Sequence, residues 1–161
     1  MHLVFIQTGG TIDKDYPQTT QGWAFEFGEP ATLRMLAKLD PSFTYQVVTA
    51  CQKDSTEITD EDRDAMWQCM QDHPAEGYLI THGTDTLIET AQYLAARADK
   101  QKVVVTGAMR PERFTNSDAP INWGMALGAV QTAPPGVYVA MHGVVKKAAD
   151  IRRDLETGKF Y

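Results

Sequence analysis

Five short apolar runs recur along this chain, and each is typical of a strand buried on both faces. They occupy residues 3–7, 45–49, 77–81, 102–106 and 136–141. The intervening segments carry helical spacing, which is clearest where Leu87, Ala91 and Leu94 share one helix face. Strands that are apolar on both faces and alternate with helices predict a mainly parallel sheet. We therefore expect one domain over residues 1–161 with a flavodoxin-like or Rossmann-like three-layer α/β/α fold and right-handed crossovers.

Composition argues against several classes of protein. The chain has 161 residues with 15 basic and 21 acidic side chains, whereas a nucleic-acid-binding protein needs a positively charged surface. No apolar stretch approaches the length of a membrane span, and we expect a cytoplasmic protein. Cys51 and Cys69 have no partner at metal-ligand spacing, and neither GxxxxGK(S/T) nor GxGxxG occurs. We therefore expect no metal and no cofactor.

Four of the five predicted strands end in small or hydroxyl-bearing residues. These ends are TGGT at 8–11, THGTDT at 81–86, TGAMRP at 106–111 and MHG at 141–143. Because the carboxyl ends of parallel strands meet at one edge of a sheet, the four segments are expected to converge on one cleft. Thr11 follows Gly9 and Gly10, which allow a sharp turn and the close approach of a ligand. This placement indicates a nucleophile.

Thr84 and Asp85 stand just before a predicted helix, where such residues are usually N-caps. Thr86 and Glu89 have the spacing of a capping box, so we expect them to start the helix. Thr84 and Asp85 would then lie outside the helix with side chains free for the cleft.

Other segments give three further expectations. Thr59 with Asp62, and Asp118 before Pro120, mark two more helix starts. Residues 13–30 lack a regular pattern over a length that is more typical of a functional lid than of a connector. The helix predicted at 120–130 is apolar around much of its circumference, which fits either a subunit interface or a deep core.

The strand-end residues suit acyl transfer. A hydroxyl nucleophile, a second threonine, a carboxylate and backbone N–H groups in a glycine-rich turn are the parts that such a reaction uses. A threonine needs a base, and His82 is of the common type near neutral pH; alternatively, it turns away from the cleft or packs structurally. Because Gly83 interrupts the strand period, the role of His82 stays open.

The motifs TGGTI at 8–12, THGTDT followed by LIETA at 81–91, and VVVTGAMRP at 103–111 resemble those of the bacterial-type L-asparaginases. Three separated motifs occur in the family's order, and the resemblance runs from Leu3 to Arg153 as the amino-terminal catalytic domain. The matching motifs do not extend to the smaller carboxyl-terminal domain of that family, and we expect the short-chain form, which consists of the catalytic domain alone. The resemblance implies hydrolysis of a small-molecule substrate and a homodimer or dimer of dimers. The lid or a partner's surface would then close the site.

The resemblance also implies roles for individual residues. Thr11 matches the nucleophile that attacks the side-chain amide of asparagine, releases ammonia and forms a β-aspartyl ester that water hydrolyses. Thr84 and Asp85 match the second catalytic pair. Further positions match the lid tyrosine, the pair that holds the α-carboxylate, a backbone carbonyl and their neighbours in the site; they are Tyr16, Ser55, Thr56, Ala108, Gly10, Asp54 and Gly83.

One position departs from the family pattern. A lysine completes the second triad in the family, whereas Arg153 stands at the matching place here. Arginine cannot act as a base, because its pKa exceeds about 12, but it can orient a carboxylate. Lys146 or Lys147 could supply the amine instead, or form a solvated turn. The alternative hypothesis is therefore a weak or inactive amino-acid-binding module.

Overall fold

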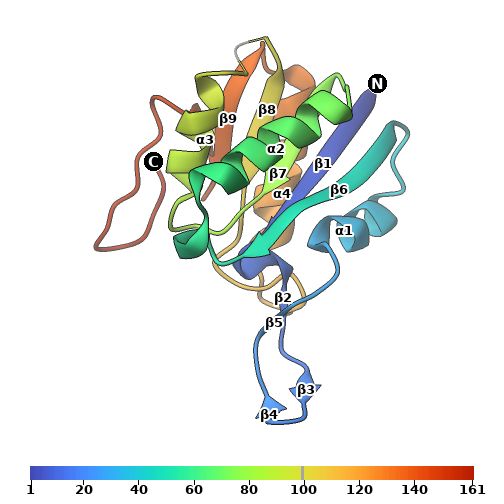
Figure 1. Cartoon of the computed structure of the whole chain (residues 1–161), viewed down its shortest axis with the longest axis vertical. Coiled ribbons are helices and arrows are strands. Elements are labelled where there is room, and N and C mark those ends of the chain that lie inside the picture. Colours follow the sequence, from blue (N-terminus) through green and yellow to red (C-terminus); the bar gives the residue numbers. More distant parts are fainter. Residues whose placement is uncertain (99) are drawn as a thin grey trace.

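The computed structural model describes residues 1–98 and 100–161. A single large sheet has the strand order β10-β9-β8-β7-β1-β6 (Figure 1). Five of its strands are parallel and β10 pairs antiparallel with β9. Numbered along the chain, the parallel strands lie in the order 2-1-3-4-5, which is the flavodoxin order. The expected fold class is confirmed. The bounds are β1 His2–Gly9, β6 Thr44–Lys53, β7 Gly77–Thr81, β8 Lys102–Thr106, β9 Gly136–Met141 and β10 Val144–Lys147.

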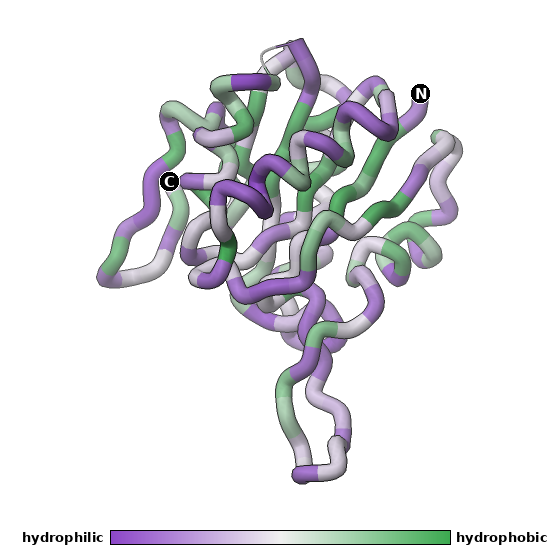
Figure 2. The backbone as a smooth tube through the Cα atoms, viewed as in Figure 1, coloured by the Kyte–Doolittle hydropathy of each residue, from purple (hydrophilic) through white to green (hydrophobic). Residues whose placement is uncertain are grey.

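Helices cover both faces of the sheet. On one face α2 (Asp60–Asp72) and α3 (Leu87–Ala95) pack Met66 and Leu94 against strand residues such as Ile80. On the other face lie α1 (Ala31–Leu39) and α4 (Ala119–Thr132), whose Trp123 stacks on Phe5 at 5.6 Å. Figure 2 shows the central strands as the most hydrophobic part of the backbone, because both of their faces are covered.

The last crossover corrects the expectation of uniform handedness. The connections through α2, α3 and α4 all move in the same direction across the sheet, yet α4 lies on the opposite face from α2 and α3 (Figure 1). The β8–α4–β9 connection is therefore left-handed, although about 98% of such connections are right-handed. To change face, residues 107–118 cross the carboxyl ends of the strands before α4 begins. This long loop thereby reaches the predicted cleft.

Residues 13–30 form a projecting hairpin instead of an irregular stretch. Two short ladders build it: β2 (Lys14–Asp15) pairs with β5 (Glu26–Phe27), and β3 (Gln18–Thr19) with β4 (Gly22–Trp23). The hairpin extends beyond the carboxyl end of the sheet (Figure 1). Strands of two residues carry no readable period, which explains why the sequence suggested no regular structure here.

All three predicted helix starts lie at the observed positions, but only one helix is capped by the predicted side chain. Thr59 and Asp62 form the expected capping box of α2. Thr86 occupies the N-cap position of α3, but its hydroxyl donates to the carbonyl oxygen of Ser55 at 2.6 Å and does not cap the helix. Asp118 does not cap α4 either, since its carboxylate accepts the backbone N–H groups of residues 109 and 110. Both side chains instead organise loops at the carboxyl end of the sheet.

Candidate active site

Glycines allow the loops at the ends of the central strands to touch. Gly10 has φ 76°, and a Cβ on it would lie 2.3 Å from the backbone nitrogen of Gly83. A Cβ on Gly83 would lie 2.7 Å from that of Ser55, and one on Gly107 would lie 2.3 Å from the carbonyl oxygen of His82. No larger residue fits at these contacts. The loops after β1, β6, β7 and β8 therefore meet at the point where strand order reverses, where ligands bind in open α/β sheets.

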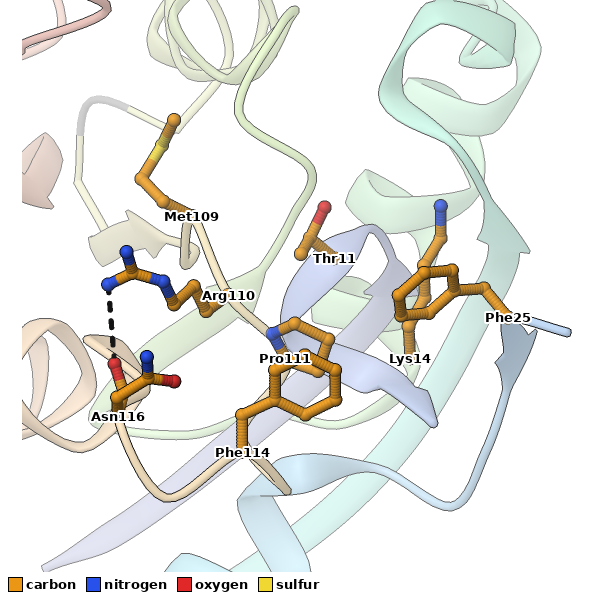
Figure 3. A pocket seen from close by; sticks show the side chains of 8 residues that line it. All are labelled: Thr11, Lys14, Phe25, Met109, Arg110, Pro111, Phe114 and Asn116. Carbon is orange, nitrogen blue, oxygen red and sulfur yellow. Dashed lines mark hydrogen bonds between the residues drawn. The ribbon is translucent and has the colours of Figure 1, made fainter. Parts of the chain in front are cut away.

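Thr11 lines a cavity of about 410 Å³, which we call the Thr11 cavity (Figure 3). Thr11 lies in a 3-10 turn, η1 (Thr11–Asp13), directly after the glycines of β1. The hairpin and the 107–118 loop supply the rest of the wall. The other lining residues are Lys14, Phe25, Met109, Arg110, Pro111, Phe114 and Asn116.

Lys14 and Asp54 connect the turns that follow β1 and β6. Lys14 Nζ lies 2.6 Å from Asp54 Oδ1, and the side chain of Lys14 is 21% exposed. The ammonium group also lies 5.5 Å from the ring centroid of Phe27. The carboxylate of Asp54, expected to bind substrate, is therefore already engaged by a cation beside Thr11.

Arg153 joins Thr84 and Asp85 on the other side of the Gly10–Gly83 contact. Its Nη1 donates to the carbonyl oxygen of Thr84 at 3.0 Å and to Asp85 Oδ1 at 3.1 Å. Its guanidinium lies 5.3 Å from the ring centroid of Phe160. The backbone N–H of Asp85 donates to Ser55 Oγ at 3.1 Å. The cation that reaches Asp85 is thus an arginine, which stays protonated and can orient the carboxylate but cannot act as a base.

The two predicted threonines line different cavities. Thr84, Asp85 and Arg153 line a second cavity of about 330 Å³ between α3 and the carboxyl-terminal segment, whereas Thr11 lines the first. The loops that carry Thr11 and Thr84 touch at Gly10 and Gly83. The structure therefore brings the two groups of residues side by side without placing them in one closed site.

The remaining predicted site residues differ in whether they are buried, exposed or facing a cavity. Ser55 is buried under Gly83, while Thr56 beside it is exposed. Ala108 is buried in the core, and its neighbour Met109 lines the Thr11 cavity. Tyr16 packs on the hairpin against Phe25 at 4.8 Å and does not itself line the cavity.

Lys146 and Lys147 are exposed on β10. Neither lines the cavity of Thr11 or that of Thr84 within the described residues, so the structure offers no support for an amine from this loop.

Sequence reasoning missed most of the Thr11 cavity. Lys14, Phe25, Phe114 and Asn116 were not singled out. The signal for Arg110 was present, because it belongs to the TGAMRP motif directly after β8. Phe25 had no such signal, since the pairing of two-residue strands brings it back beside Thr11.

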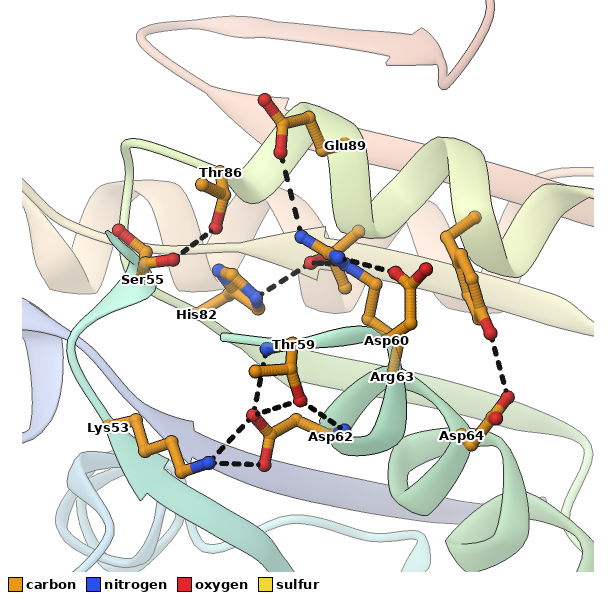
Figure 4. A network of polar contacts seen from close by, with 12 residues as sticks. Lys53, Ser55, Thr59, Asp60, Asp62, Arg63, Asp64, His82, Thr86 and Glu89 are labelled. Carbon is orange, nitrogen blue, oxygen red and sulfur yellow. Dashed lines mark hydrogen bonds and ion pairs between the residues drawn. The ribbon is translucent and has the colours of Figure 1, made fainter. Parts of the chain in front are cut away.

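His82 is buried and acts through its neighbours (Figure 4). Its Nδ1 lies 2.8 Å from the carbonyl oxygen of Gly83, which only accepts, so Nδ1 carries the proton. Nε2 then accepts from the hydroxyl of Thr90 at 2.9 Å, and that oxygen accepts from Arg63 Nε at 3.1 Å. Burial, with a smaller contribution from the charge of Arg63, lowers the pKa of His82 to about 4. The open question about His82 is resolved in favour of a neutral structural residue.

Asp13 fixes the base of the hairpin. Its Oδ1 accepts from the backbone N–H of Ala31 at 2.7 Å, and its carbonyl oxygen accepts from that of Gly28 at 3.0 Å. Thr81 at the end of β7 donates to Oδ2 at 3.4 Å. Burial raises the pKa of Asp13 to about 6, despite these hydrogen bonds. The carboxyl group of Asp13 thus ties the base of the hairpin to α1 and β7, while its backbone carbonyl holds the returning end of the hairpin.

Comparison with protein families identifies the chain. A family model described as "Asparaginase, N-terminal" matches residues 2–157. The chain belongs to this family. The three motifs that resemble bacterial-type L-asparaginases all fall within the matched region.

Individual relatives agree with this membership. The chain is 33% identical over 147 residues to an L-asparaginase of Thermococcus kodakarensis, covering 87% of this chain and 44% of that protein. It is 31% identical over 145 residues to a subunit of the glutamyl-tRNA(Gln) amidotransferase of Archaeoglobus fulgidus, covering 86% of this chain and 34% of that protein. The solved structure of the thermostable L-asparaginase from T. kodakarensis superposes with a TM-score of 0.83 and 30% identity, covering 95% of this chain and 48% of that one. This member of the asparaginase family therefore spans less than half the length of each of these relatives.

Neither a membrane-spanning helix nor a metal centre is found among the described residues. No helix in residues 1–98 or 100–161 is long and apolar enough to cross a membrane. Within the same ranges, no group of three or more His, Cys, Asp or Glu side chains is arranged to hold a metal ion.

Proposed function

We propose that this asparaginase-family protein is an amidohydrolase that converts L-asparagine and water to L-aspartate and ammonia, with Thr11 as the nucleophile. The observation that carries the proposal is the position of Thr11 after a glycine turn at the switch point of the sheet, next to the loop of Thr84. Family membership supports the reaction class. No metal or cofactor is part of the proposal.

In the proposed reaction, Thr11 Oγ attacks the side-chain amide carbon. The C–N bond breaks, the hydroxyl proton leaves with the amine as ammonia, and a β-aspartyl ester remains on Thr11. Water then hydrolyses the ester and restores the hydroxyl group. The backbone N–H groups of Thr11 and Ile12, at the start of the η1 turn, adjoin the nucleophile in the chain and would stabilise the oxyanion.

The other groups would orient the substrate and the second threonine. Arg153 holds the carboxylate of Asp85 and the backbone of Thr84, so its proposed role is positioning. Ser55 accepts from the backbone of Asp85 and thereby links the turn after β6 to the same loop. Thr11 and Thr84 line neighbouring cavities, and the loops that carry them touch at Gly10 and Gly83, so the proposed nucleophile and the second threonine stand on adjoining loops.

Ammonia release from L-asparagine tests the proposal. We expect Thr11→Ala and Thr84→Val to lose at least about 99% of the wild-type rate, because removing one member of a nucleophilic site costs about 10²-fold or more. Circular dichroism checks that both variants fold. Thr44→Val, at the exposed start of β6 and therefore at the opposite end of the sheet from the strand ends, is the matched control and should keep the wild-type rate. A wild type no faster than Thr11→Ala would exclude the proposed activity.

The second candidate function is an amino-acid-binding module that has lost catalysis. The observation that favours it is the Arg153–Asp85 pair, since arginine cannot supply the base that a lysine would. Arg153→Lys separates the two functions. A gain of ammonia release would indicate a module whose catalysis was lost with the lysine, whereas a loss would show that arginine serves an active enzyme.

We also propose that the protein forms a homodimer through the outer face of α4. Ile121 on that face is 67% exposed, and a Cβ added to Gly124 or Gly128 would have no neighbour within 4 Å outside its own helix. A cavity of about 410 Å³ runs between α1 and α4 and is lined by Met35, Lys38, Leu39, Pro120, Trp123, Gly124 and Leu127. The alternative expectation, that α4 is apolar because it lies in a deep core, therefore does not account for its outer face.

A further inference from the structure

The charges around Thr11 match the carboxylate of a free amino acid better than its ammonium group. The Thr11 cavity has two cations in its wall, Lys14 and Arg110, and no Asp or Glu side chain among its lining residues in the described structure. The α-ammonium group of asparagine needs an anionic partner when it leaves water. Asp85, the residue expected to bind it, lines the other cavity and pairs with Arg153. The carboxylate of Asp54 already pairs with Lys14.

One of the two cations is available to a ligand. Arg110 is exposed, and within residues 1–98 and 100–161 its guanidinium makes only a long contact of 3.4 Å to the carbonyl oxygen of Asn116 (Figure 3). Its backbone is fixed, because Asp118 accepts from the N–H of Arg110 at 3.1 Å. A guanidinium on a fixed backbone can bind a carboxylate with two hydrogen bonds.

An exposed row of aromatic rings leads from the hairpin into the same cavity. We call Trp23, Tyr16, Phe25 and Phe114 the aromatic strip. Consecutive ring centroids are 6.1, 4.8 and 6.2 Å apart, and the last two rings line the Thr11 cavity. The four residues are between 37% and 62% exposed. Contiguous exposed aromatics beside a cavity mark a binding surface for an apolar group.

From these observations we infer that the preferred substrate is an asparagine whose α-nitrogen is acylated, with an apolar or aromatic acyl group. The carboxylate binds Arg110, the acyl group lies on Phe25 and Phe114, and the side-chain amide faces Thr11. Acylation converts the ammonium group into a neutral amide, which removes the charge that this cavity does not match. This inference rests on the proposed amidohydrolase function.

The acyl group does not enter the chemistry. The bond that breaks is the C–N bond of the side-chain amide, water supplies the new oxygen, and ammonia leaves, so that the products are an N-acyl-aspartate and ammonia. Apolar area and stacking on the aromatic strip provide binding energy that free asparagine cannot obtain.

Ammonia release from N-benzyloxycarbonyl-L-asparagine and from L-asparagine tests the inference. We expect kcat/KM of the wild type to be at least about tenfold higher for the acylated amide. In Phe25→Ala and Phe114→Ala, the ratio of the two kcat/KM values should fall by about tenfold. Tyr45→Ala is the control, because this tyrosine is 44% exposed on β6 and outside the aromatic strip, and it should keep the ratio. A wild-type ratio at or below one, or a ratio unchanged by both phenylalanine variants, overturns the inference.

Binding of the products separates this inference from the proposed function. If neither amide releases ammonia, the proposed activity fails, and calorimetry with N-benzyloxycarbonyl-L-aspartate and L-aspartate decides whether the ligand class is correct. Tighter binding of the acylated compound that weakens about tenfold in Phe114→Ala and Arg110→Ala supports the class. Absence of binding, or equal binding by wild type and both variants, overturns it.

Discussion

His82 directly precedes Gly83 and Thr84 in the chain, but its side chain lines neither the Thr11 cavity nor the cavity of Thr84. Its ring donates to the carbonyl oxygen of Gly83 and accepts from Thr90, and both nitrogens are therefore occupied. A pKa near 4 keeps the ring neutral at physiological pH. The histidine thus shapes the turn that carries Gly83 and Thr84, and it is unavailable as a general base.

Two replacements of His82 should differ in stability. In His82→Asn the amide can still donate to the carbonyl oxygen of Gly83, whereas His82→Leu leaves that oxygen without its donor and the hydroxyl proton of Thr90 without its acceptor. We expect the leucine variant to lose about 1–3 kcal/mol more unfolding free energy than the asparagine variant, because unpaired buried polar groups are costly. Urea unfolding measures both values. Equal stabilities would contradict the hydrogen-bond assignment.

Asp13 makes a prediction about pH. Its pKa is raised from 3.8 to about 6 by burial, so the folded state holds the proton more tightly than the unfolded state. The folded state is therefore relatively stabilised below pH 3.8, and this advantage disappears as pH rises through about 6. Compared with Asp13→Asn, the wild type should gain about 2 kcal/mol between pH 7 and pH 4.

Urea unfolding of both proteins across this pH range measures the difference. Subtracting the curve of Asp13→Asn removes the effect of other groups, including His82, whose lowered pKa destabilises the folded state as pH falls. A difference that does not vary with pH would show that Asp13 titrates normally.

At the scale of elements, apolar runs predicted the five parallel strands, and residues typical of N-caps predicted three of the helix starts. Each expected run lies within an observed strand, because strands covered on both faces are apolar throughout. The hairpin was not predicted, since its two-residue strands have no period. The face occupied by α4 was not predicted either, because a helix pattern does not encode the hand of its crossover.

The candidate site was predictable to a similar extent. The strand-end motifs supplied Thr11, Thr84 and Asp85, and the ion pair of Asp85 with Arg153 joins residues 68 positions apart. The aromatic wall formed by Phe25 and Phe114 depended on the hairpin and on the left-handed crossover, and it required the structure.

Contacts between glycines set the geometry of the strand ends, and a pair of substitutions tests them. Gly10→Ala would place a Cβ at 2.3 Å from the backbone of Gly83 in addition to its strained φ of 76°. Gly22 in the hairpin also has positive φ, at 108°, but nothing lies within 4 Å of its Cβ position. We expect Gly22→Ala to cost about 1 kcal/mol and Gly10→Ala at least about 2 kcal/mol more. If urea unfolding gives similar losses of unfolding free energy for the two variants, the turns after β1 and β7 do not touch.

At the scale of the whole molecule, the carboxyl-terminal segment completes the domain. Residues 152–161 fold back as a hairpin, with backbone hydrogen bonds between Arg152 and Tyr161 in both directions. Phe160 is buried in the core shared by α2 and α3, and its backbone N–H donates to His142 Nδ1. This hairpin carries Arg153 to Asp85, so the candidate site depends on a segment far from its motifs.

The proposed dimer makes the last prediction. The outer face of α4 places Ile121 and the small residues Gly124 and Gly128 in solvent, beside the cavity between α1 and α4. Burying such a face against a second copy would remove apolar area from water at about 25 cal/mol per Å². Light scattering should therefore give twice the monomer mass of 17.9 kDa for the wild type and the monomer mass for Ile121→Asp. Leu155→Asp is the control, because Leu155 is 90% exposed on the carboxyl-terminal hairpin, away from α4, and it should leave the dimer intact. A monomeric wild type would contradict the dimer, and a dimeric Ile121→Asp variant would place the interface elsewhere.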